Sequence, residues 1–163
     1  MSFSAPTDPP AIADERELLL AFLQLQRELV AASTVGVSEE QARWRPDGRL
    51  ISLIGIVNHL THVERRWIDR SYGGQAVPKR SEEEFTVGPD RTLEEVVAAY
   101  ADRAAATDRT VRAAPGLDAP CRGPAQSTVD LRWVLLHLIE ETAHHAGHAD
   151  STREMLDGHL SGW

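Results

Sequence analysis

Histidine is the residue type in this chain whose number and spacing are suited to chemistry. The chain has 163 residues and seven histidines, and four of these fall in the twelve-residue stretch 137–148. Imidazole titrates near neutral pH and is the commonest metal-binding side chain in proteins. We therefore expect proton transfer or metal binding in the densest part of this stretch, Glu140-Glu-Thr-Ala-His-His-Ala-Gly-His148.

This stretch contains two pairs of candidate ligands, Glu141 with His145 and His144 with His148. Both pairs have the i,i+4 spacing that places two side chains on one face of a helix. A helical wheel at about 100° per residue puts Glu141 and His145 beside the apolar stripe, His148 at its margin and His144 largely away from it. That stripe is formed by Leu131, Leu135, Leu138, Thr142, Ala149 and Leu156. The wheel favours Glu141 and His145, and a half-buried carboxylate without a cation would be unfavourable.

A second helical stretch offers His59 and His62. His59 lies closer to the apolar stripe of its own helix than His62 does, by about 60° on the wheel. Two imidazoles and one carboxylate leave an open position on a metal ion, as catalytic sites do. Such an ion lowers the pKa of bound water to about 7 and holds a bound thiol as thiolate. The alternative is a bundle with ordinary surface and core histidines, because single i,i+4 pairs also arise by chance.

Helical periodicity and capping residues predict the elements that position these side chains. We expect helices over about 12–33, from Ser52 to Gly73-Gly74, from Thr92 to about Ala114, and from near Ser127 or Thr128 to Asp157-Gly158. With no convincing strand and no internal repeat, this pattern predicts an all-α four-helix bundle. The connection 75–91 is long enough for a crossover between the second and third helices, and its run Ser81-Glu-Glu-Glu84 is expected to be solvated. In the earlier connection, 35–49, Trp44 is the expected apolar anchor.

Length and composition set further limits. The length suits one domain, which we place at 12–163 after a flexible leader at 1–11. There are 25 acidic and 17 basic residues, and this net charge of −8 argues against a nucleic-acid partner. No apolar run reaches the roughly 18 residues that span a bilayer, and no secretory signal is present, so we expect a cytoplasmic protein. The single cysteine, Cys121, forms no intrachain disulfide and has no evident activating partner.

Two blocks of sequence also carry a family resemblance. They are Ser52-Leu-Ile-Gly-Ile-Val-Asn-His-Leu-Thr-His-Val-Glu-Arg-Arg-Trp67 and His137-Leu-Ile-Glu-Glu-Thr-Ala-His-His-Ala-Gly-His-Ala-Asp-Ser-Thr-Arg-Glu154. Together with the helix order, they make the chain resemble the DinB-like metal-binding bundle superfamily. Within it, the chain is similar to the mycothiol-dependent branch of maleylpyruvate isomerase and mycothiol S-transferases.

The resemblance implies a ligand set. The superfamily has one ligand histidine on the second helix and two ligands four residues apart on the fourth, often both histidine, in a pattern ending His-x-Gly-Gln. Here His145-Ala-Gly-His148 aligns with that ending, so the earlier ligand falls on Glu141, and the mycothiol isomerase branch also uses glutamate there. The implied metal ligands are His59, Glu141 and His145. His148 replaces the usual glutamine and is our candidate catalytic residue. It could act as a proton shuttle, as an extra metal ligand, or as a group that contacts a ligand without binding the metal.

The resemblance also implies an activity. We expect one divalent metal ion, zinc or nickel before iron or manganese, and mycothiol as the thiol co-substrate. The thiol would be transferred to a small electrophile or would isomerise it. A non-catalytic metal-binding or stress-response module remains an alternative, as does a thiol-independent hydrolase with His148 as base. Relatives often form dimers, and among Trp44, Trp67, Trp133 and Trp163 we take Trp133, which lies off the apolar stripe, as the best candidate for a homodimer interface.

Overall fold

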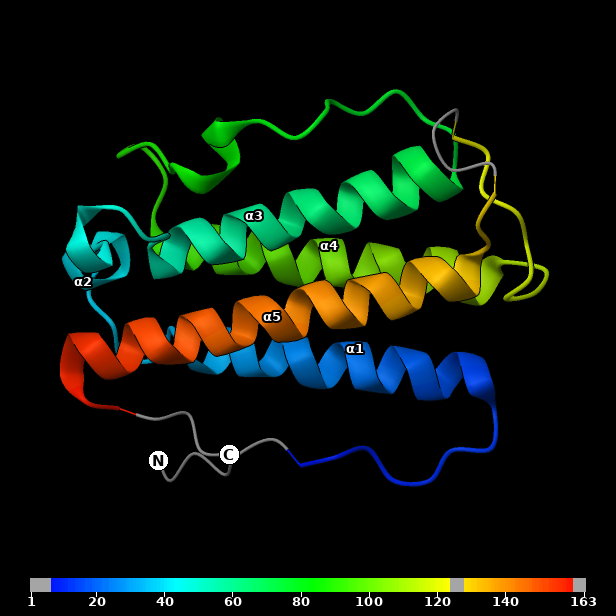
Figure 1. Ribbon diagram of the computed structural model, residues 1–163, viewed down its shortest axis with the longest axis horizontal. Helices are drawn as coiled ribbons and strands as arrows, with labels where there is room; N and C mark the ends of the chain where they lie inside the picture. Colours follow the sequence, from blue (N-terminus) through cyan, green and yellow to red (C-terminus); the bar gives the residue numbers. More distant parts are fainter. Residues whose placement is uncertain (1–6, 124–127, 160–163) are drawn as a thin grey trace.

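The computed structural model describes residues 7–123 and 128–159, in which every regular element is a helix and no strand occurs. Four long helices form a bundle: α1 (Glu15–Ala32), α3 (Leu53–Arg65), α4 (Leu93–Ala113) and α5 (Leu131–Asp157) (Figure 1). Shorter elements are α2 (Glu39–Arg43), the 3-10 turns η1 (Pro46–Gly48) and η3 (Glu82–Phe85), and η2 (Arg66–Tyr72), where the winding of α3 widens into a π-helix. The prediction of an all-α four-helix bundle is confirmed.

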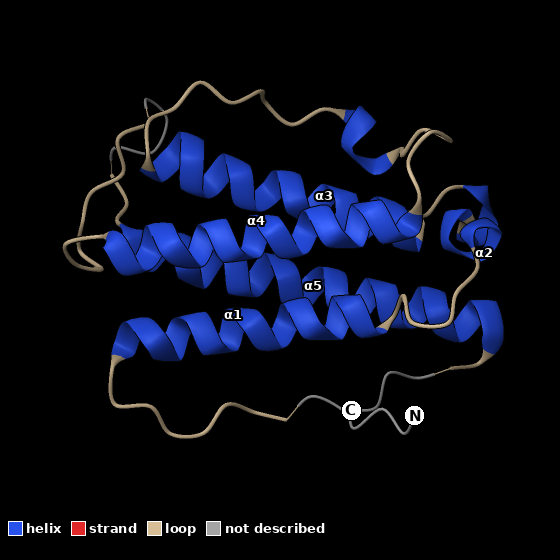
Figure 2. Ribbon diagram, turned by 180° about the vertical axis from the view of Figure 1, so that it is seen from behind, coloured by secondary structure: helices blue, strands red, loops and turns tan. Residues whose placement is uncertain are grey.

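The helices form two parallel pairs, α1 with α5 and α3 with α4, and the two pairs run in opposite directions (Figure 1). Two contacts fix the direction of α4 against α3: Arg91, just before α4, bonds Asn58, and Arg103 pairs with Asp69 beyond the end of α3. The connection between these helices must therefore return along the whole bundle. It is a crossover, as the length of the connection allowed, and Figure 2 shows it as a loop over one face, interrupted by η3.

The beginnings of the long helices are fixed by side chains that accept hydrogen bonds from free backbone N–H groups. Asp14 caps α1, Ser52 caps α3, and Thr92 and Glu95 form the capping box of α4. The last helix begins later than predicted, at Leu131, because Asp130 has an extended backbone and accepts from the N–H of Trp133. Ser127, one of the two predicted start positions, lies outside the described residues, as do Trp163 and residues 1–6 of the expected leader.

The anchor of the connection between α1 and α3 is not Trp44. Ala42 is fully buried and Pro46 is also buried, whereas Trp44 remains 38% exposed. Trp44 is the residue that ends α2, and its extended backbone turns the side chain to a surface hollow that it lines with Leu156. The prediction of Trp44 as the main apolar anchor is therefore wrong.

The crossover is held closely against α3 at η3. A β-carbon at Gly55 would lie 2.6 Å from the carbonyl oxygen of Phe85, so only glycine permits this approach. The side-chain amide of Asn58 donates to the carbonyl oxygen of Glu84 at 2.7 Å. The charge run in this loop is consequently not solvated throughout, since Glu84 is only 6% exposed. That expectation is wrong for Glu84 because the backbone contacts carry its side chain against the bundle.

A buried ion pair crosses the core between the two pairs of helices. Arg27 of α1 bonds both carboxylate oxygens of Glu64 at 2.8 Å and also reaches Asp108 of α4 at 3.0 Å. The side chains of Arg27 and Glu64 are 4% and 1% exposed. The three charges of Arg27, Glu64 and Asp108 therefore tie α1, α3 and α4 together. Within the described residues, no helix is long and apolar enough to cross a membrane.

Candidate metal centre

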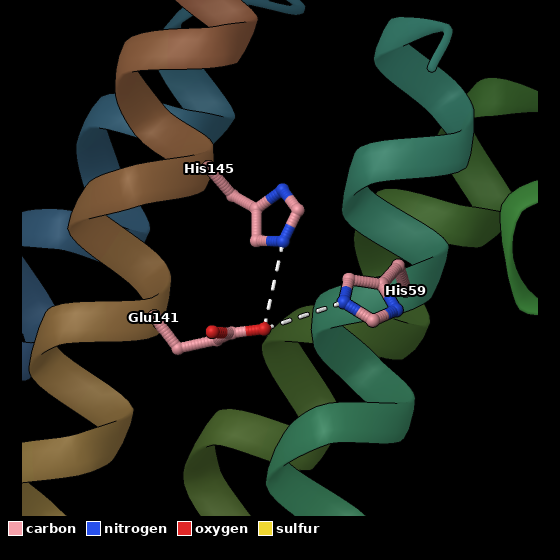
Figure 3. A group of neighbouring side chains, drawn as sticks. All are labelled: His59, Glu141 and His145. Carbon is pink, nitrogen blue, oxygen red and sulfur yellow. Dashed lines mark ion pairs between the residues drawn. The ribbon is translucent and has the colours of Figure 1, made fainter. Parts of the chain in front are cut away.

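Three side chains from two antiparallel helices converge between α3 and α5. His59 projects from α3, and Glu141 and His145 project from successive turns of α5 (Figure 3). The Nε2 atoms of both histidines lie 3.6 Å from the same carboxylate oxygen, Oε1 of Glu141. One ligand atom from each of the three residues lies within 4.8 Å of the others, and this is the group of potential metal ligands found among the described residues.

These distances fit a metal ion better than direct hydrogen bonds. A separation of 3.6 Å exceeds the usual range for an N–H···O bond. A zinc ion about 2.0–2.1 Å from each donor in tetrahedral geometry places neighbouring donor atoms about 3.4 Å apart. Two imidazole nitrogens and one carboxylate oxygen are also donors that zinc, nickel and iron accept. The residue types and the two distances to Oε1 of Glu141 therefore suit a single divalent ion.

The ring of His59 is held in one orientation by the crossover. Its Nδ1 atom lies 3.1 Å from Oε2 of Glu84, on the side of the ring away from Glu141. The ring of Phe85 stacks on the imidazole at 4.2 Å between centroids. A carboxylate on Nδ1 holds the proton there and leaves Nε2 free as a donor to a metal, which is the usual support of a ligand histidine.

The electrostatics of the site favour ionised carboxylates. The neighbouring imidazoles, His145 first and then His59, hold the pKa of Glu141 far below its usual value. Burial opposes the ionisation of Glu84, but the hydrogen bond and charge of Arg66 lower its pKa overall. Both histidines are buried, whereas the side chain of Glu141 is 32% exposed. The centre is therefore not sealed from solvent.

Comparison with known proteins identifies the family of this chain. A family model described as Mycothiol-S-transferase matches residues 18–158. The chain belongs to the mycothiol S-transferase family. This is a DinB-like family, so the resemblance in the two sequence blocks is confirmed.

The other comparisons bear on the fold. Among solved structures, the chain is similar to the crystal structure of a conserved protein from Enterococcus faecalis, with a TM-score of 0.58 and 14% identity over 91% of this chain and 100% of the other. At that identity the similarity shows a shared fold and no shared activity. No curated protein matches this mycothiol S-transferase family member.

The remaining histidines of this family member lie outside the three-residue cluster. His144 and His148 are exposed and pack edge to face, with ring centroids 4.5 Å apart. The ring of His148 lies 5.6 Å from that of His145, and burial and the charges of His144 and His145 lower its pKa. His148 is thus beside the centre without being part of it, as the wheel indicated.

Two more histidines that the sequence left without a role have definite surroundings. His62 is half-buried on α3 and lines a cavity of about 290 Å³ with Arg66 and Lys79, and burial lowers its pKa. His137 stacks on Trp133 at 5.3 Å and contacts Trp67 at 4.4 Å between ring centroids. Neither of the two reaches the ligand cluster.

The residue that sequence reasoning missed is Glu84. It was included in an expected solvated run, although the serine three residues before it was a signal: Ser81 and Glu84 form a capping box at η3. Arg66, the first residue of η2, bonds the Oε1 atom of Glu84, so the same carboxylate contacts this helix at two positions about two turns apart. The lone cysteine, Cys121, is 5% exposed, and burial raises the pKa of its thiol.

Proposed function

We propose that this protein binds one divalent metal ion through His59, Glu141 and His145 and transfers the sulfur of mycothiol to a small electrophile. The observation that carries the proposal is the position of Glu141 Oε1, 3.6 Å from the Nε2 atoms of both histidines. Membership of the mycothiol S-transferase family supports mycothiol as the thiol. The donor set favours zinc or nickel, with iron or manganese also accepted.

The ion and the side chains have different roles in the proposed reaction. A divalent ion held by these three residues would lower the pKa of a thiol bound to it. His59 and His145 hold their Nε2 atoms toward the place where the ion would lie, and the partial exposure of Glu141 leaves the centre open to substrate. His148, with its lowered pKa, is neutral at neutral pH and accepts the thiol proton.

The proposed transfer balances without an oxidant or reductant. With a chlorinated aromatic as electrophile, sulfur forms a bond to the ring carbon and the carbon–chlorine bond breaks. Chloride leaves with the bonding electron pair. The thiol proton passes through His148 to solvent, so the products are a thioether and hydrogen chloride.

A direct test compares four mixtures of purified protein: with and without zinc, and with and without mycothiol, each with a chlorinated nitroaromatic. We expect thioether, detected by mass spectrometry, only when both zinc and thiol are present. A Cys121→Ala variant serves as control and retains turnover, because the reacting thiol arrives with the substrate. Turnover without thiol supports the hydrolase alternative, and metal binding without turnover with any cellular thiol supports a non-catalytic module.

We also propose that the protein is a cytoplasmic homodimer. A thiol co-substrate must remain reduced, as thiols are in the cytoplasm. Trp133 is 43% exposed and Leu136, one turn away on α5, is 53% exposed, so the two form an apolar patch suited to a contact between copies. Sedimentation of Trp133→Arg against wild type tests this, since the variant is expected to be monomeric.

A further inference from the structure

A second cavity, of about 190 Å³, opens between α3 and α5 beside the candidate metal centre. Its floor contains the buried side chains of Ile56 and Thr152, which are 1% and 4% exposed. Apolar side chains of Leu50, Ile51 and Met155 form much of its wall. The cavity is therefore an apolar recess in the groove between the two helices.

The position of this cavity relative to the metal ligands follows from the helix register. Ile56 precedes His59 by three residues on α3, and His148 follows His145 by three residues on α5. Because α3 and α5 are antiparallel, both displacements point toward the same end of the bundle (Figure 1). Three residues correspond to about 4.5 Å along a helix. The cavity thus adjoins the ligand cluster, with His148 lining the side toward it.

The rim of the cavity exposes two large apolar side chains. Leu50 and Met155 are each 54% exposed, the highest values among the large hydrophobic side chains of the described residues. Both line this recess. An apolar group seated between them would remove this surface from water, which is the main favourable contribution to binding such groups.

The size and lining indicate one aromatic ring. An apolar cavity of about 150 Å³ in a protein core binds benzene, so about 190 Å³ accommodates one substituted ring. Three of the lining groups also favour a ring over a saturated group of equal size. They are the thioether of Met155, the imidazole of His148 and the guanidinium of Arg49, which attract the faces or edges of aromatic rings.

We propose that this cavity is the binding site for the electrophile and selects substrates that carry a single aromatic ring. The inference rests on the proposed function for the reaction that follows binding. The binding itself needs neither thiol nor turnover. Ile56, Met155 and Leu50 determine the specificity of the site through the volume and apolar surface they provide.

The test uses an unreactive ring, para-fluorotoluene, and the full-length protein without thiol, followed by fluorine NMR. We expect saturable binding to wild type and weaker binding of fluorocyclohexane. Ser151 lines the cavity and is exposed on α5, so Ser151→Phe fills the recess without altering the core. We expect this variant to weaken binding of the ring by about tenfold or more. Glu154→Phe is the matched control: Glu154 is exposed on the same helix but does not line the cavity, and binding is expected to be unchanged.

Each contrary result overturns the proposal. Equal binding by wild type and Ser151→Phe, with both variants helical by circular dichroism, places the ring elsewhere. If wild type shows no saturable binding of the ring and Ser151→Phe sediments as a different oligomer from wild type, the recess is a contact between copies and not a ligand site. A failure of the proposed function gives a different result. A protein that binds the ring in this cavity but forms no thioether has the proposed binding site without the proposed reaction.

Discussion

Oε2 of Glu84 lies 3.1 Å from Nδ1 of His59, although the two residues are 25 positions apart in the chain. The contact exists because the crossover between α3 and α4 returns along the bundle and packs η3 against α3. It orients the one candidate ligand that α3 supplies. Several of the predictions below depend on this contact and on the three-residue cluster that it supports.

The ligand assignment predicts which histidines are needed for metal. Alanine at His59, Glu141 or His145 is expected to abolish binding of zinc, because two remaining donors do not complete the site. Alanine at His144 or His159 is expected to retain one equivalent, since both lie outside the cluster. Elemental analysis of the purified variants measures this. Loss of metal in His144→Ala together with retention in Glu141→Ala contradicts the assignment.

The contact of Glu84 with His59 predicts an effect on metal affinity. Glu84→Gln keeps an oxygen near Nδ1 but removes the charge that makes the imidazole a stronger donor, and such changes weaken metal binding about 10–100-fold. Competition with a chromophoric chelator measures the affinity. Glu83→Gln is the control, since Glu83 is exposed in the same turn and has no hydrogen bond to His59. Similar losses in both variants argue against a specific role of Glu84.

The close approach at Gly55 predicts an indirect effect on the same site. In Gly55→Ala the new methyl group would lie 2.6 Å from the carbonyl oxygen of Phe85, so η3 must move and the contact of Glu84 with His59 is weakened. We expect lower metal affinity in the same competition assay. Gly147→Ala is the matched helical control, because no atom lies within 4 Å of its new β-carbon. It should gain up to about 1 kcal/mol of stability from helix propensity. Unchanged affinity in Gly55→Ala shows that η3 does not position His59.

The buried ion pair predicts a large loss of stability. Arg27→Met leaves the carboxylate of Glu64 buried without its cation, which costs about 3–5 kcal/mol of unfolding free energy. Arg112→Met breaks a largely exposed pair with Glu17 and is expected to cost less than about 1 kcal/mol. Urea unfolding measures both. A loss of similar size in the two variants means that the buried pair does not tie the helices together.

The lowered pKa of Glu84 predicts a dependence of stability on pH. Burial alone raises this pKa, but the hydrogen bond and charge of Arg66 lower it overall, below the value of about 4.3 for an unfolded glutamate. A carboxyl group whose pKa is lowered by folding stabilises the folded state above the unfolded pKa, and this contribution is lost as pH falls through the folded pKa. Metal-free wild type should therefore lose more unfolding free energy between neutral pH and about pH 3 than Glu84→Gln does. Parallel losses in the two proteins contradict the prediction.

The sequence by itself determined the helices and the choice of candidate ligands. Periodic apolar residues and capping residues such as Ser52 and Thr92 act locally, so the four long helices could be predicted from the chain, although the first and last begin later than predicted, at Glu15 and Leu131. The wheel also separated His145 from His144, because the direction of a side chain on a helix depends only on its position in the turn. Whether these residues bind metal remains a prediction.

Only the tertiary structure decided what surrounds those ligands. No local period relates Glu84 to His59, and the spacing of Ser81 and Glu84 indicates a capped turn but not that Glu84 is buried. The path of the crossover selects it, together with the close approach that Gly55 permits. The cavity beside His148 likewise depends on how Ile56 of α3 and Met155 of α5 face each other, which follows from the packing of two helices and not from either one alone.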